Sequence, residues 1–88
     1  MRSRIVYYGR VQGVGFRWNV ADAMKYFTLT GTVQNLTDGT VEVVLEGDLK
    51  EIKDAKLAID SRMKGYWITN ETEYKEGEAH FSTFSIIR

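Results

Sequence analysis

The residues best suited to chemistry lie between Gly9 and Arg17, in the stretch Gly-Arg-Val-Gln-Gly-Val-Gly-Phe-Arg. Its glycines let the backbone adopt positive φ values and approach a ligand closely. If a helix begins near Val14, its first N–H groups lack partners and lie at the positive end of the helix dipole. Arg17 adds a permanent charge beside them. The stretch predicts a site for a small anion such as phosphate, with an ordinary turn between a strand and a helix as the alternative.

This stretch differs from two common nucleotide-binding loops. A Walker loop needs a second glycine where Val14 stands, followed by a Lys-Ser or Lys-Thr pair that is absent here. The dinucleotide-binding motif needs a third glycine where Trp18 stands. The sequence therefore favours a small anion over a nucleotide.

Length and charge narrow the choice of ligand further. The 88 residues predict a single small domain, residues 1–88. Twelve basic and twelve acidic residues cancel, which argues against a general attraction to nucleic acid or to an anionic membrane. Basic residues nevertheless dominate residues 1–25, where Asp22 is the only acid. A locally positive face in a neutral protein suits a small anionic ligand.

Several kinds of chemistry are excluded or disfavoured by composition. The chain has no cysteine, which excludes disulfides, zinc–thiolate sites and thiol nucleophiles. No cluster of His, Asp and Glu has the spacing of metal ligands, so we expect no metal and no cofactor. The only histidine, His80, is expected to have a surface or sheet role. No stretch has the length of a membrane span or the core of a signal peptide, and a cytoplasmic protein is the expectation.

Runs of β-forming residues alternate with amphipathic patterns along the chain. Apolar residues at spacings of three and four predict two helices, over residues 16–27 and 49–63. The expected strands are residues 4–11, 29–36 and 41–45, and a last β region that can divide into 66–74 and 80–87 at an acidic turn.

Turn and cap residues connect these elements. Asp38-Gly39 between two β-type runs is a strong hairpin signal, so the second and third strands should be antiparallel neighbours. Asp48 can cap the second helix with Glu51 as its capping-box partner, and Gly65 stops that helix. The order β-α-β-β-α-β predicts an α+β, ferredoxin-like sandwich with an antiparallel sheet and both helices on one face.

Two stretches together resemble the acylphosphatase family. One is Gly9 to Arg17, and the other is Gly31 to Glu42, which fits the family pattern Gly-x-Val-x-Asn-x-x-Asp-Gly-x-Val-Glu. The resemblance implies hydrolysis of acyl phosphates, small-molecule anhydrides of a carboxylic acid and phosphoric acid, to carboxylate and inorganic phosphate. It also implies that phosphate is held by Arg17 and by the backbone amides of Gln12, Gly13, Val14, Gly15 and Phe16. By the same resemblance, Asn35 holds the attacking water.

The chemistry of phosphoryl transfer agrees with that assignment. It demands mainly positioning and charge stabilisation, which a ring of amides and a bidentate guanidinium supply without a metal. Asn35 cannot act as a base, so the water proton is expected to go to a phosphate oxygen of the substrate. The resemblance thus points to a stand-alone, monomeric enzyme with no cofactor, nucleic acid or membrane partner.

Three positions depart from the family pattern, and one of them is Gly65-Tyr66, where the family frequently has Gly-Pro. Thr28 stands where the family usually has a glycine after the first helix. A β-branched residue in a left-handed cap would be strained by about 1–2 kcal/mol, unless the helix ends in another way. Thr32 replaces a common aromatic residue. These differences affect packing and leave the expected site residues unchanged.

Three alternatives remain at this point. A similar glycine-rich run opens the large carbamoyltransferases of hydrogenase maturation, but a proline usually follows the arginine there and Trp18 follows it here. A non-catalytic anion-binding module on the same fold is the second alternative. The third is an RNA-binding sheet, which needs exposed aromatic residues that the strand over residues 41–45 lacks.

Overall fold

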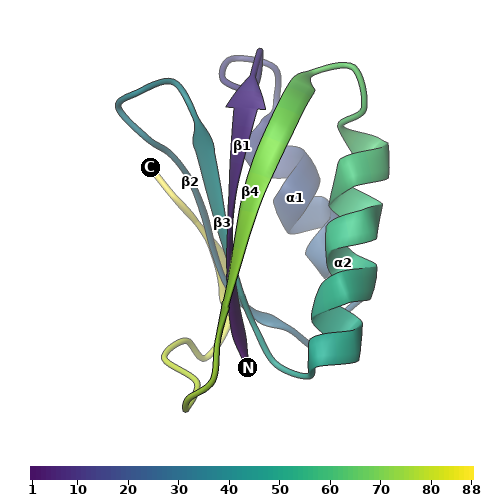
Figure 1. Cartoon of the computed structure of the whole chain (residues 1–88), viewed down its shortest axis with the longest axis vertical. Helices are drawn as coiled ribbons and strands as arrows, with labels where there is room; N and C mark the ends of the chain where they lie inside the picture. Colours follow the sequence, from purple (N-terminus) through teal and green to yellow (C-terminus); the bar gives the residue numbers. More distant parts are fainter.

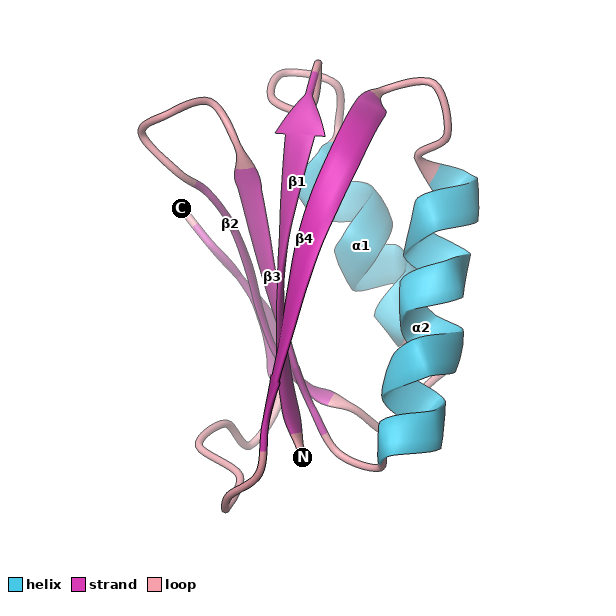
Figure 2. Ribbon diagram, viewed as in Figure 1, coloured by secondary structure: helices cyan, strands magenta, loops and turns pink.

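The chain folds in the order expected from its hydrophobic pattern, and the computed structural model describes residues 1–88 (Figure 1). The elements are β1 (Arg2–Gly9), α1 (Phe16–Met24), β2 (Thr30–Asn35), β3 (Val41–Glu46), α2 (Leu49–Arg62), β4 (Trp67–Lys75) and β5 (Phe84–Ile87). Both helices lie on one face of a five-stranded sheet (Figure 2). The predicted ferredoxin-like α+β fold is confirmed. Neither helix is long and apolar enough to cross a membrane.

The sheet is mixed rather than wholly antiparallel. Its strand order is β4-β1-β3-β2-β5, and only β2 and β5 run parallel to each other. The reason is that β4 occupies the edge beside β1, so the chain must reverse and cross to the opposite edge. After that reversal β5 runs in the direction of β2, and Gly31 pairs with Phe84.

The core lies between the sheet and the two helices. Phe16, the first residue of α1, packs against Tyr7 of β1 with 5.0 Å between their ring centroids. Because both side chains are buried, this contact fixes where α1 starts relative to the end of β1. Most of the helix residues expected to face the core are buried: Phe16, Val20 and Ala23 in α1, and Ile52, Ala55 and Ile59 in α2. Phe27, also expected on the first face, lies beyond the end of α1, and both it and Leu49 are half-buried.

The end of α1 differs from the strained cap considered for Thr28. The helix ends in right-handed geometry at Lys25, and no residue other than glycine has a positive φ. Thr28 instead donates from its backbone N and its Oγ1 to the carboxylate of Glu51, at 2.8 and 2.7 Å. The expected strain is therefore absent, because Thr28 does not adopt the left-handed conformation.

The same contact changes the cap of α2. Asp48 accepts a hydrogen bond from the backbone N of Glu51 at 3.3 Å, so the predicted N-cap is present. The Glu51 carboxylate, however, binds Thr28 instead of the backbone of Asp48. Glu51 thus joins the start of α2 to the chain after α1, and the reciprocal half of the capping box is not formed.

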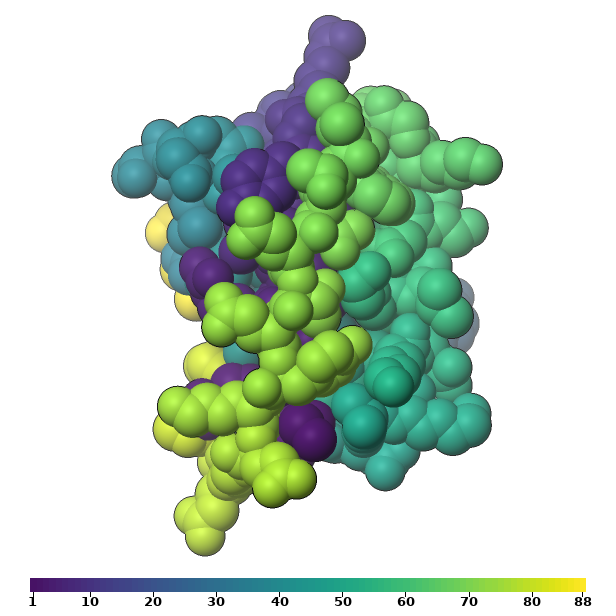
Figure 3. All heavy atoms as spheres, in the orientation of Figure 1, coloured from purple at the N-terminus to yellow at the C-terminus, as the bar shows by residue number.

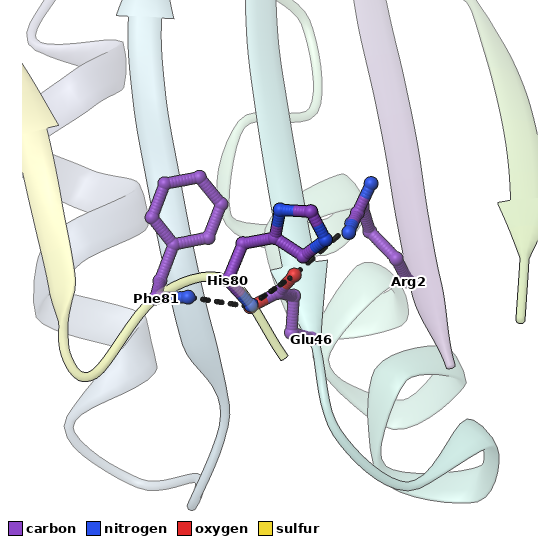
Figure 4. Close-up of polar contacts among 4 residues, drawn as sticks. All are labelled: Arg2, Glu46, His80 and Phe81. Carbon is purple, nitrogen blue, oxygen red and sulfur yellow. Dashed lines mark hydrogen bonds and ion pairs between the residues drawn. The ribbon is translucent and has the colours of Figure 1, made fainter. Parts of the chain in front are cut away.

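A buried carboxylate holds the segment that crosses from β4 to β5. Glu46, at the end of β3, accepts hydrogen bonds from the backbone N of His80 and of Phe81 and from Nε of Arg2, at 2.8 to 3.0 Å (Figure 4). Burial opposes the charged form of Glu46, but the N–H groups and the Arg2 guanidinium outweigh burial and lower its pKa. One ionised side chain, at the end of β3, therefore holds the segment between β4 and β5 in place.

Candidate active site

The loop between β1 and α1 has the backbone geometry of an anion-binding turn. Gly13 and Gly15 both have φ of 77°, a left-handed conformation that side chains disfavour. Left-handed residues alternating with others turn successive N–H groups towards one concave side. In Figure 3 this loop and the β4–β5 segment project from opposite ends of the molecule.

The N–H groups of this loop have no acceptor within the protein. No backbone N–H from Gln12 to Trp18 donates a hydrogen bond to a backbone or side-chain acceptor. Gly15 is the N-cap of α1 and supplies no side chain, and its carbonyl accepts from the backbone N and the Nδ2 of Asn19. Asn19 thus binds the carbonyl oxygen of Gly15, and the first N–H groups of α1 remain without a partner. Unsatisfied N–H groups at a helix start attract anions.

A pocket of about 220 Å³ lies beside this loop and α1. Of the predicted site residues, it brings together Gly13, Gly15, Phe16, Arg17 and Asn35. Gln12 and Val14 do not line it. The remaining lining residues are Val11, Trp18, Ile86 and Arg88. None of the nine has a carboxylate or imidazole side chain.

The two side chains expected to act on the substrate have no protein partner. Arg17 and Asn35 are both half-buried. Arg17 forms no ion pair with any acidic residue, and neither side chain makes a hydrogen bond within the protein. Asn35 is the last residue of β2 and pairs with Val41 across the predicted hairpin, which places it at the sheet end near the loop (Figure 1). Both groups are therefore available to a ligand.

Gln12 connects the two halves of the pocket. Its Nε2 donates to the carbonyl oxygens of Leu36 and Thr40 at 2.7 and 2.9 Å. These carbonyls belong to the turn that follows Asn35, and Leu36 and Thr40 also bond to each other through their backbones. The side chain of Gln12 therefore fixes the loop against the β2–β3 turn, a role that the sequence did not predict.

Sequence reasoning also missed the wall formed by Trp18, Ile86 and Arg88. Trp18 directly follows Arg17, so its place could have been found from a helix drawn from Phe16. Ile86 and Arg88 could not, because they reach the pocket only through the parallel pairing of β5 with β2. His80 is exposed in the β4–β5 segment and does not line the pocket.

Comparisons with known proteins agree with the fold and the motifs. The acylphosphatase of Thermococcus kodakarensis is 47% identical over 53 residues, which are 60% of this chain and 58% of that protein. The acylphosphatase of Methanospirillum hungatei is 35% identical over 99% of this chain and 97% of its own. The crystal structure of acylphosphatase from Bacillus subtilis superposes with a TM-score of 0.90 at 30% identity, covering 99% of this chain and 98% of that one. The acylphosphatase family model matches residues 3–86, and the chain belongs to that family.

Proposed function

We propose that this protein hydrolyses acyl phosphates to a carboxylate and inorganic phosphate, without a metal. The relatives named acylphosphatase support an enzyme of this hydrolase class. One observation supports the proposal most strongly: the unsatisfied N–H groups from Gln12 to Trp18 lie beside the unpaired Arg17, in a pocket that Asn35 also lines. These donors and this cation suit a small anion such as a phosphoryl group.

In the proposed reaction the phosphoryl group binds the loop amides and the Arg17 guanidinium. Charge spreads over the equatorial phosphoryl oxygens in the transition state, and fixed N–H dipoles and a bidentate cation stabilise it. None of the residues that line the pocket is Asp or Glu, so no acidic side chain there repels the substrate. The carboxylate of an acyl phosphate is a good leaving group, so no side chain need protonate it.

Asn35 is proposed to orient the attacking water. Its amide can both accept a hydrogen bond from water and donate one, and nothing in the protein occupies it. It cannot remove the proton, which passes to a phosphate oxygen of the substrate. Water attacks phosphorus, the bond to the acyl oxygen breaks, and the carboxylate leaves with the electron pair.

The test is phosphate release from acetyl phosphate and benzoyl phosphate in the presence of a chelator. We expect wild-type turnover to survive the chelator. Asn35→Ala should lower kcat by at least about 10²-fold, as loss of a positioning group does, while inhibition by inorganic phosphate stays within a few-fold. Asn70→Ala, on β4 and outside the pocket, is the matched control.

Other results would contradict the proposal in different ways. Phosphate binding by the wild type without any turnover would favour a non-catalytic anion-binding module. If Asn35→Ala lost phosphate inhibition together with turnover, Asn35 would shape the loop rather than hold water. We also propose that residues 1–88 act as a single domain, as a monomer and in the cytoplasm, which are predictions from the sequence.

A further inference from the structure

A second arginine, Arg88, lines the pocket in addition to Arg17. Neither arginine is in an ion pair. Gln34 of β2 pairs with Ile87 of β5, and the next residues along these parallel strands are Asn35 and Arg88. Arg88, directly after β5, therefore lies at the same end of the sheet as Asn35, the last residue of β2.

Three of the four other arginines of the chain have acidic partners, and the fourth, Arg10, does not line the pocket. Arg2, Arg4 and Arg62 are all in ion pairs with acidic side chains. A second pocket of similar volume is lined by Arg2, Arg4, Glu73, Tyr74 and Lys75, and Glu73 pairs with Arg4 there. The two arginines of that pocket therefore already have acidic partners. The pocket with Arg17 and Arg88 is lined by two unpaired arginines and by no acidic side chain.

The walls beside Arg88 are apolar. Trp18, 62% exposed, and the half-buried Ile86 line the pocket next to the loop residues. In the proposed function, the loop amides and Arg17 bind the oxygens of one phosphoryl group. The acyl group attached to it then shares the pocket with an indole, an aliphatic side chain and a second arginine. Such a lining suits a hydrocarbon that has an anionic group.

We propose that Arg88 makes the site selective for acyl phosphates whose acyl group has a second negative charge, such as a carboxylate, at its far end. The proposal rests on the proposed hydrolysis of acyl phosphates and specifies its substrate class. The charge-assisted hydrogen bond from the Arg88 guanidinium to that carboxylate supplies the selectivity, and Trp18 and Ile86 contact the hydrocarbon between the two charges.

The test compares benzoyl phosphate with 3- and 4-carboxybenzoyl phosphate, which differ only in the second charge and its position. For at least one carboxylated substrate we expect wild-type kcat/KM to exceed that for benzoyl phosphate by about tenfold, the range of a charged hydrogen bond at a half-exposed site. Arg88→Gln should bring this ratio close to one. Arg10→Gln, at another unpaired arginine that does not line the pocket, should leave the ratio at its wild-type value.

Each failure has a distinct signature. No hydrolysis of benzoyl phosphate by the wild type would refute the proposed function itself. Hydrolysis with no preference for either carboxylated substrate would overturn the role of Arg88 and leave the function intact. An equal loss for all three substrates in Arg88→Gln would mean that Arg88 binds the phosphoryl group. Thermal unfolding of each variant confirms that the ratios are measured on folded protein.

Discussion

The two ends of β1 present the same kinds of donors but differ in what accepts from them. At the start of β1, the Arg2 guanidinium and two backbone N–H groups bind the carboxylate of Glu46. Beyond the end of β1, the Arg17 guanidinium and the N–H groups from Gln12 to Trp18 have no acceptor in the protein. The donors at the start of β1 bind a carboxylate of the protein itself, whereas those beyond its end are available to a ligand.

This difference separates structural arginines from those available for binding. Arg2 has a fixed buried acceptor, so its charge contributes to holding the β4–β5 crossing in place. Arg17 has none, so its charge is free to act on whatever enters the pocket. A buried donor without an acceptor is costly in a folded protein. A donor at the surface is tolerated, because water or a ligand can accept its hydrogen bond. The comparison therefore predicts opposite responses to mutation at the two ends.

The largest effect is expected at Arg17. Arg17→Lys keeps the charge but loses the two-pronged geometry, so kcat/KM for benzoyl phosphate should fall by about 10³-fold, in the range seen for arginines in phosphoryl transfer. Steady-state kinetics measure it. Arg2→Lys, the same change at the other end, should stay within about twofold because it tests only a structural contact. Similar losses of kcat/KM in Arg17→Lys and Arg2→Lys would contradict the different roles of the two ends of β1.

A smaller effect is expected where Gln12 joins the loop to the β2–β3 turn. Gln12→Ala removes both hydrogen bonds to Leu36 and Thr40, so Asn35 shifts relative to the loop. We expect kcat to fall by about tenfold or more, and inhibition by phosphate to weaken less than threefold. Gln34→Ala is the matched control, because its Nε2 binds the carboxylate of Glu42 and does not line the pocket. An unchanged kcat would show that the two halves align without Gln12.

The smallest effect on activity is expected at Glu46, where stability should change instead. The lowered pKa of Glu46 means that its ionised form stabilises the fold above its ordinary pKa, and that this stabilisation is lost as the pH falls through the folded-state pKa. At pH 7, Glu46→Gln should lower the free energy of unfolding by about 1–3 kcal/mol. Towards pH 3 the difference from wild type should shrink. Activity of the folded variant should change less than twofold.

Urea unfolding at the two pH values measures this effect. Glu73→Gln is the control, because Glu73 is exposed and its ion pair with Arg4 spans 3.6 Å. A stability gap that stayed constant or widened as the pH fell would show that the charge of Glu46 is not what holds the crossing.

The sequence predicted the features that depend on neighbours along the chain. The glycine-rich loop and the hairpin at Asp38-Gly39 follow from local patterns. That Arg17 and Asn35 line one pocket is known from the structure, because it depends on how the strands are arranged in the sheet. Local patterns do not specify which distant segments pair. The parallel β2–β5 pair, and with it Ile86 and Arg88 at the pocket, therefore escaped prediction. The contact of Thr28 with Glu51 escaped for the same reason, because 23 residues separate them.

The long reach of these pairings has a consequence for how the protein forms. Arg2 of β1 lies opposite both Glu46 and Lys75, and Gly31 of β2 lies opposite Phe84, so β1 and β2 each lack one neighbour until β4 and β5 are present. Such distant pairings slow the search for the native state, while a chain without proline has no slow X-Pro isomerisation step. The pocket wall at Ile86 is completed only when β5 docks. During synthesis, binding competence should therefore arise late and together with the complete sheet.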